Sequence, residues 1–311
     1  MNLSGLWVVF STKRRRTTLG NYIIVEAWAK LQQLCIPATI KRLQSQELSN
    51  KPITDPESTT YVSLTTYGPR VDRVHLAIES IARGTSRPGR IVLWLDDVDI
   101  DNPPVKLKQL QQRGLELRQT INYGPHKKAY PALRETVPED WVFVTADDDV
   151  FYPSWWLDRI EAAVKLEPDV IVCLRALAYR LTDKSSLLAP MKEWRWVNET
   201  KPSCAHFAIG VSGIAYPPRL RKALVDRGTA FLAAAPKADD VWINAVAAEL
   251  NIGIKQASKR RKIFPSIPGT KDTALMHTNV TGGQNDVQIR QTYSATAIAN
   301  IRKGLKTCVC R

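Results

Sequence analysis

The stretch from residue 141 to residue 153 reads Trp141-Val-Phe-Val-Thr-Ala-Asp-Asp-Asp-Val-Phe-Tyr-Pro153. Its first six residues are apolar or β-branched, so they predict a buried strand, and three carboxylates follow directly. Side chains alternate faces along a strand, so we expect Asp147 and Asp149 to point the same way and Asp148 to point away. Carboxylates aimed together repel each other unless a cation lies between them, and hard oxygen ligands select Mg2+, Mn2+ or Ca2+. The stretch therefore predicts a metal site at a strand end, with Asp149 as the most direct ligand and Asp148 as a bystander.

Strand and helix patterns alternate along the chain on both sides of this stretch. We expect strands at residues 61–67, 90–95, 115–117, 141–146, 169–174 and 252–256, and helices at residues 71–82, 105–113, 154–166, 217–226 and 238–250. This alternation predicts an α/β fold with one mostly parallel central sheet flanked by helices. Ligands of such sheets bind beyond the carboxyl ends of the strands, where Thr65, Asp96 and the carboxylates at 147–149 all fall.

Composition and charge indicate the class of protein and of partner. The chain has 311 residues, of which 44% are hydrophobic, enough for one large α/β domain with additions. Its net charge of +14 favours anionic partners such as nucleotide phosphates, acidic lipid headgroups or nucleic acid. The five cysteines include no Cys-x-x-Cys pair, which favours reduced thiols over a disulfide framework or a zinc site.

The N-terminal region carries no segment typical of membrane insertion. Its longest apolar run, residues 6–10, is far shorter than the roughly 20 residues that span a bilayer. The run also precedes the basic cluster at residues 13–16, which is the reverse of the order in a signal peptide. We therefore expect a cytoplasmic protein without a transmembrane helix. The basic cluster could touch the inner face of the membrane as a peripheral contact, although a solvated basic turn is the commoner role of such a run.

Six pieces of the sequence, taken in order, resemble the GT-A nucleotide-sugar glycosyltransferases. The resemblance is to the bacterial family-two-like enzymes of surface-polysaccharide synthesis, and it covers about residues 60 to 256. The pieces are residues 62–70, 90–97, 127–133, 144–149 with Tyr152-Pro153, 210–213 with Tyr216-Pro-Pro218, and 238–242. The Asp-x-Asp motif alone would be weak, whereas the six pieces together are specific as a set.

The resemblance implies a fold, a reaction and its partners. The fold would be a single GT-A (Rossmann-like) domain at residues 59–257, with a nucleotide-binding half at 59–174 and an acceptor or catalytic half at 175–257. Residues 1–58 would be an N-terminal extension, and residues 258–311 a tail that completes the site. The reaction would move a sugar from a nucleotide-sugar, a UDP-sugar above all, to a hydroxyl of a glycan or lipid-linked acceptor. The cofactor would be Mn2+ or Mg2+.

The resemblance also assigns roles to individual residues. It places Thr65, Tyr67, Arg70 and Asp96 at the nucleotide base and ribose, and Lys127 or Lys128 at the base or diphosphate. Asp147 would contact the ribose and the metal, Asp149 would bind the metal, and His277 would be a further metal ligand. Gly210 and Gly213 would lie beside the donor sugar. The resemblance makes Asp240 the base of an inverting transfer. Because Asp is favoured at helix starts, we expect Asp239 to cap the helix that begins there, and the helix dipole to keep Asp240 ionised.

Each role has a plainer alternative, and two other functions compete with sugar transfer. The acidic triplet could be a polar turn, the two lysines a solvated pair, and His277 a loop histidine. Trp194 and Trp196 are the tryptophans best placed for an acceptor, although core packing is their plainer role. A nucleotidyltransferase would normally carry a glycine-rich phosphate loop after its first strand, but residues 66–70 hold a single glycine. A nucleic-acid-binding protein would show a basic patch or a known motif, whereas here the positive charge is scattered.

Overall fold

The structure is a computed structural model that describes residues 37–43, 45, 50–96, 100–182, 187–270 and 283–309. The chain divides into two compact units, residues 1–41 and residues 42–311. Of the first unit, residues 37–41 are described, and they are helical. The fold and the candidate site described below belong to the second unit.

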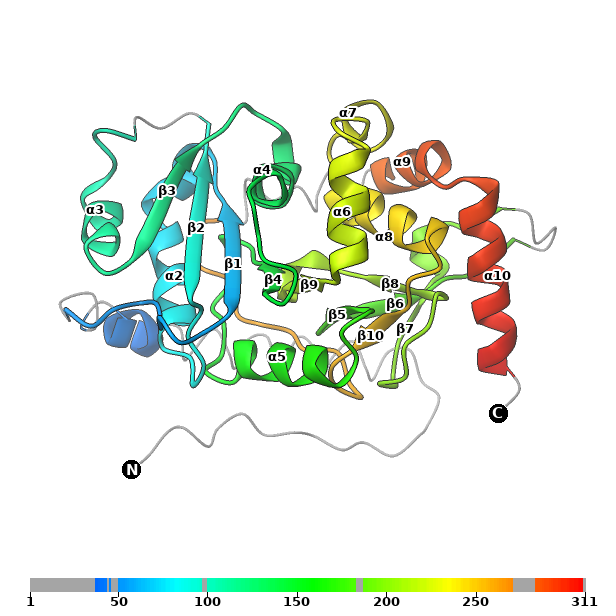
Figure 1. The fold of residues 1–311 in the computed structure, drawn as a ribbon, viewed down its shortest axis with the longest axis horizontal. Coiled ribbons are helices and arrows are strands. Elements are labelled where there is room, and N and C mark those ends of the chain that lie inside the picture. Colours follow the sequence, from blue (N-terminus) through cyan, green and yellow to red (C-terminus); the bar gives the residue numbers. More distant parts are fainter. Residues whose placement is uncertain are drawn as a thin grey trace. The chain divides into compact units, whose positions relative to one another are not determined.

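A seven-stranded sheet forms the centre of the second unit (Figure 1). Its order is β10 (Ile254–Gln256), β5 (Ile171–Cys173), β9 (Ile214–Tyr216), β4 (Val142–Thr145), β1 (Thr60–Thr65), β2 (Arg90–Leu95) and β3 (Leu115–Gln119). Every neighbouring pair is parallel except for the two pairs that β9 makes, with β4 and with β5. The predicted α/β class with a mostly parallel sheet is therefore confirmed.

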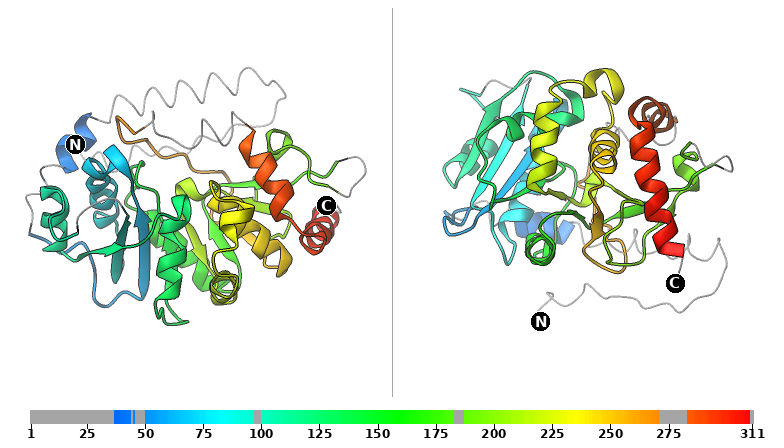
Figure 2. Two further views of the ribbon diagram at one scale, coloured as in Figure 1. Left: turned by 90° about the horizontal axis from the view of Figure 1, so that it is seen from above. Right: turned by 45° about the vertical axis from the view of Figure 1, so that its right-hand side comes forward.

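The sheet is buried on both faces, as parallel sheets require. Along β1, Tyr61 packs into one hydrophobic cluster while Val62 and Leu64 pack into the other. The second cluster also contains apolar side chains of α2 (Val74–Ala82), α3 (Val105–Gln111) and α5 (Trp156–Leu166). The first contains side chains of α4 (Tyr130–Arg134), α6 (Pro218–Asp226), α8 (Asp239–Glu249), α9 (Gln284–Thr292) and α10 (Ala295–Val309). Figure 2 shows α9 and α10 beside α8, against which both pack.

Several elements differ from the sequence-based expectation. A small antiparallel sheet, for which no strand was expected, joins β7 (Arg195–Trp196), β6 (Ala176–Ala178) and β8 (His206–Ala208). A 3-10 helix, η2 (Gly68–Asp72), follows the first expected strand, since proline is well tolerated in a first helical turn. Further short elements are η3 (Gly124–Lys128), η4 (Met191–Glu193), η5 (Gly210–Ser212) and α7 (Phe231–Ala234). The helices α9 and α10 lie in a tail for which the sequence predicted no element.

Two expectations about membranes and cysteines can be compared with the described part of the chain. Among these residues, no helix combines the length and the apolar character needed to cross a membrane. Cys173 and Cys204 carry free thiols, and Cys173 is buried.

Candidate active site

The acidic triplet, Asp147 to Asp149, lies just beyond the end of β4. Two cationic side chains and one hydroxyl group contact it there. Asp148 accepts hydrogen bonds from the Thr66 hydroxyl at 2.6 Å and from Arg70 Nη1 at 2.7 Å. Arg70 Nη2 also lies 3.2 Å from Asp149 Oδ2. Asp147 Oδ1 accepts a hydrogen bond from Lys128 Nζ at 2.7 Å. Much of the repulsion within the triplet is thus relieved by Arg70 and Lys128.

The expectation that Asp148 does not ligate the metal stays a prediction, but its side chain has a clear structural role. Its side chain is the most buried of the three, and it is held by Arg70 and Thr66. The strand ends at Thr145, so the alternation of faces that isolated Asp148 does not continue through the triplet. Burial raises the pKa of Asp148, while Arg70 and the Thr66 hydroxyl oppose that rise. Asp148 therefore serves to fix the triplet rather than to face a ligand.

Lys128 joins the triplet to the first turn of α8. Its Nζ lies 2.7 Å from Asp147 Oδ1 and 3.0 Å from Asp239 Oδ2, and the side chain is buried. Burial alone would lower the pKa of Lys128, but Asp147, Asp239 and Asp240 hold it well above its ordinary value. Lys128 therefore stays charged and draws carboxylates from two distant segments to one point.

Asp239 and Asp240 do not behave as helix-capping residues. The residue before the helix is Ala238, with no side-chain cap, and Asp239 turns instead toward Lys128. Asp240 Oδ2 accepts a hydrogen bond from the Gly210 amide at 3.1 Å. Burial, followed by repulsion from Asp239, raises the pKa of Asp240 to about 7. Desolvation thus opposes the ionisation of Asp240 near neutral pH that the helix dipole was expected to favour, and that expectation stays a prediction.

The glycine at 210 is required by this arrangement. A Cβ on Gly210 would lie 2.7 Å from Asp240 Oδ1 and 3.4 Å from Lys128 Nζ. Gly213, by contrast, faces the indole of Trp156 and has a φ of +90°. Of the two predicted glycines, Gly210 thus borders the carboxylates and Gly213 packs into the core.

A second charged cluster, formed by Lys127 and Asp96, lies beyond the end of β2. Lys127 Nζ forms a salt bridge with Asp96 and lies 3.3 Å from the Thr66 carbonyl oxygen. Thr65 donates its hydroxyl to the Trp94 carbonyl at 2.9 Å. The ring of Tyr67 lies 5.3 Å from the Arg70 guanidinium. The two lysines therefore divide between two clusters, with Lys127 at Asp96 and Lys128 at the triplet.

Two of the remaining candidates lie away from these clusters, and one is not described. Trp194 is buried, donates its Nε1 to the Ala189 carbonyl and packs against Tyr179 and Phe207, so it belongs to the core. Trp196 is partly buried beneath two arginines. His277 lies outside the described residues.

Three site residues were missed from the sequence. Thr66 contacts both clusters, through its hydroxyl to Asp148 and its carbonyl to Lys127. The Tyr152 hydroxyl accepts a hydrogen bond from the Asp147 amide at 2.7 Å. Buried Asn244 donates to the Asp240 carbonyl at 2.7 Å and to that of Ala208 at 2.9 Å. The spacing of Asn244 from Asp240, one helical turn, was a signal that could have identified it.

No family model matches the sequence, and no curated protein is similar to it. Among solved structures, Staphylococcus aureus TarS 1–349 is similar with a TM-score of 0.45 and 16% identity, over 69% of this chain and 61% of that chain. GalNAc-T7 with UDP, GalNAc and Mn2+ gives a TM-score of 0.42 and 11% identity, over 64% of this chain and 42% of that chain. CMP:2-keto-3-deoxy-manno-octonic acid synthetase complexed with CTP gives a TM-score of 0.39 and 10% identity, over 64% of this chain and 88% of that chain. The chain thus matches about three fifths of the length of the TarS structure.

Proposed function

We propose that this protein is a glycosyltransferase that moves a sugar from a nucleotide-diphosphate donor to a hydroxyl acceptor. The observation that carries the proposal is the position of Lys128, whose Nζ lies within 3.0 Å of both Asp147 and Asp239. Sugar transfer requires a place for the diphosphate leaving group and a base for the acceptor hydroxyl. The Lys128 bridge places candidates for both at one edge of the sheet.

The donor diphosphate would lie at Asp147 and Asp149 with a divalent cation. Asp149 Oδ1 is buried and has no hydrogen-bond partner within the described residues, so it can still ligate a cation. Mg2+ and Mn2+ are commonly held by one or two carboxylates together with substrate phosphates. The cation would be shared with the substrate, since among the described residues no three His, Cys, Asp or Glu side chains are arranged to hold a metal ion by themselves. Bound there, the cation would neutralise the leaving diphosphate.

The pKa of Asp149 responds to burial and to the charges around it. Burial, followed by repulsion from Asp147 and Asp148, raises the pKa of Asp149 to about 6 despite the nearby Arg70. A cation bound to this carboxylate would favour its ionised form. Since Arg70 is already committed to Asp148 and Asp149, we propose that it positions the triplet instead of binding the base.

The other half of the reaction would rest on Asp240. A general base works best when its pKa lies near the working pH, and the pKa of Asp240 is about 7. Gly210 holds the carboxylate through its amide, and Asn244 holds the Asp240 backbone. Deprotonation of the acceptor hydroxyl by Asp240 would give transfer with inversion. Asp96 and Thr65, at the neighbouring strand ends, would face the nucleoside.

A panel of nucleotide-sugars with Mn2+ tests this proposal, with release of the nucleoside diphosphate as the readout. We expect at least one donor to be turned over by the wild type and by Asp158→Asn, a control at an exposed position of α5. Asp240→Asn should still bind that donor but lose turnover by at least about 100-fold, as expected for removal of a general base. Full turnover in Asp240→Asn would contradict the assigned base, and no turnover of any donor by the wild type would contradict the reaction class.

A further inference from the structure

A further cluster of charged side chains lies outside the carboxylate site. The Arg261 guanidinium carbon lies 4.1 Å from the ring centroid of Trp196, and that of Arg175 lies 5.4 Å from the same centroid. Arg175 follows β5, Trp196 belongs to β7, and Arg261 belongs to the basic run at 259–262 after β10. Three separate segments of the fold therefore bring two arginines onto one indole.

This cluster has no direct ion-pair partner within the described part of the chain. Neither Arg175 nor Arg261 forms a salt bridge or a side-chain hydrogen bond with any described residue, and Arg175 Nε is buried without an acceptor. Burial, followed by repulsion from Arg261, lowers the pKa of Arg175 to about 10. Desolvated arginines are normally paired with carboxylates, so this arrangement is costly without an anion. The indole offsets only part of that cost, because one cation–π contact contributes on the order of 1 kcal/mol.

The cluster lies on the Asp240 side of the site. The carbonyl of Arg175 accepts a hydrogen bond from the Ile209 amide at 3.0 Å, and the next residue, Gly210, holds Asp240. Asp240 is also the carboxylate whose field acts on Arg175. Strand β9 separates β5 from β4, which places the two strand ends about 10 Å apart, at two strand spacings. An anion at the arginines would therefore lie beside the base and away from the donor diphosphate at the triplet.

We propose that Arg175, Arg261 and Trp196 form an anion-binding subsite for a phosphate or carboxylate group of the acceptor, so that the enzyme glycosylates an acidic acceptor. A guanidinium binds either group through two parallel N–H donors, and the Trp196 ring keeps the Arg261 guanidinium in place. The identity of the bound molecule as an acceptor rests on the proposed function, whereas the anion site itself does not.

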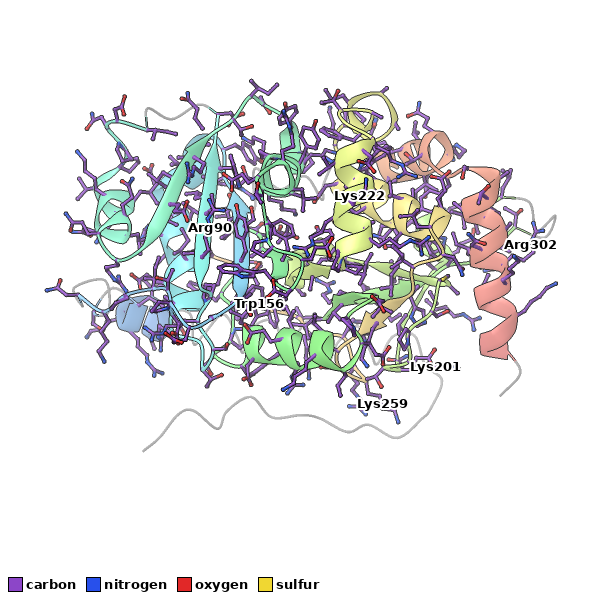
Figure 3. All side chains as sticks on the ribbon, in the orientation of Figure 1. Arg90, Trp156, Lys201, Lys222, Lys259 and Arg302 are labelled. Atoms are coloured by element: carbon purple, nitrogen blue, oxygen red, sulfur yellow. The ribbon has the colours of Figure 1, made fainter. Side chains whose placement is uncertain are left out.

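The first test is a calorimetric titration of the full chain with inorganic phosphate, in the presence of saturating UDP and Mn2+ to occupy the donor site. The variants are Arg175→Gln and Arg261→Gln, with Lys259→Gln as the matched control. Lys259 belongs to the same basic run but is exposed, and Figure 3 shows it at the periphery. We expect phosphate affinity to fall at least about tenfold in both arginine variants, since each variant loses a charge-assisted hydrogen bond to the anion. It should be unchanged in the control. Equal affinity in all four proteins would overturn the anion site.

Chemical modification of the wild type keeps the test independent of how the variants fold. Phenylglyoxal should modify Arg261, the less buried of the two arginines, and phosphate should slow this modification, as mapped by mass spectrometry. Modification that phosphate does not slow would overturn the site even if the variants were unstable.

A second arm identifies the source of the anion. Transfer rates are compared for matched sugar acceptors that are neutral, phosphorylated or carboxylated. We expect Arg261→Gln to raise the acceptor KM at least about tenfold for the acidic acceptors and to leave kcat and the donor KM nearly unchanged. Phosphate binding that depends on the arginines, together with equal use of neutral and acidic acceptors, would overturn the acceptor assignment but not the anion site. A failure of the proposed function would instead appear as no transfer to any acceptor.

Discussion

At the residue scale, the proposed role of Asp240 as the base predicts that activity depends on pH. Its pKa of about 7 means that the base is protonated below neutrality and ionised above it. We therefore expect kcat/KM to rise tenfold per pH unit below pH 7 and to level off above it. A pH profile between 5 and 9 measures this. A profile that is flat between pH 5 and 8 would contradict the role of Asp240 as base.

The same carboxyl also links stability to pH, with the opposite trend. An ordinary Asp has a pKa near about 4, so between about pH 4 and 7 the native state holds a proton that the unfolded state has released. The unfolding free energy of the wild type should therefore decrease as pH rises through this range. Asp240→Asn lacks this term and should gain about 2 kcal/mol relative to the wild type between pH 5 and 7. Denaturant titrations at pH 5 and pH 7 measure the unfolding free energies of the two proteins. If the free energy of the variant minus that of the wild type is the same at both pH values, the raised pKa is contradicted.

Asp148 is a structural residue, in contrast to its neighbours in the triplet. Asp148→Ala removes the closest carboxylate partner of the buried Arg70 guanidinium, and it also removes the acceptor of the Thr66 hydroxyl. Breaking a buried ion pair in this way costs about 3 kcal/mol or more. The exposed Asp158→Ala should change the unfolding free energy by less than about 1 kcal/mol. Denaturant unfolding in EDTA compares the two, and similar values would show that the Arg70–Asp148 pair is dispensable.

The sequence predicted which residues belong to the site better than it predicted which side chains contact one another. Strand ends and helix starts are visible in the sequence, which is why Asp96, the triplet and Asp240 were all selected. The pairing of Lys127 with Asp96, and of Lys128 with Asp147 and Asp239, depends on where η3 passes the sheet. Adjacent lysines give no signal in the sequence for that division. The raised pKa of Asp240 could not be predicted either, because it arises from burial by residues distant in the chain.

At the element scale, the turn from η5 into β9 depends on Gly213. Its φ of +90° is unfavourable for other residues, and a Cβ there would lie 2.7 Å from Trp156 Cζ2. Gly213→Ala should lower the unfolding free energy by roughly 2–4 kcal/mol, from backbone strain and overpacking together. Gly228→Ala is the control, because it shares a positive φ of +54° but has no atom within 4 Å of the new Cβ. It should cost about 1 kcal/mol, and equal losses in the two variants would contradict the packing argument.

The elements that could not be predicted from the sequence are those that depend on tertiary packing. Strand β9 is only three residues long, and a short apolar run does not reveal its direction. The tail helix α10 contains Gly304, which weakens a helical pattern. In the structure that glycine lets the helix approach closely, since a Cβ there would lie 2.8 Å from the Ala205 amide. Helix α10 also buries Ala297 and Ile301 in the cluster shared with α8, and this packing supplies the stability that the local sequence lacks.

At the scale of the whole molecule, the order of strands and helices could be predicted because hydrophobic periodicity records which faces are buried. That order was enough to place the strand ends at one edge of a mostly parallel sheet, and the structure bears this out. The net charge of +14 indicated an anionic partner but not where it binds. The structure suggests two candidate locations, the carboxylate site bridged by Lys128 and the arginines on Trp196.

The central claim is that a nucleotide diphosphate and a divalent cation bind together at the acidic triplet. Calorimetric titration with nucleoside diphosphates, in Mn2+ and in EDTA, tests it most directly when the wild type is compared with Asp149→Asn. We predict that one nucleoside diphosphate binds the wild type in Mn2+, and that EDTA or Asp149→Asn weakens this binding at least about tenfold. Binding of equal strength in all of these conditions, or no binding of any nucleoside diphosphate to the wild type, would contradict the claim.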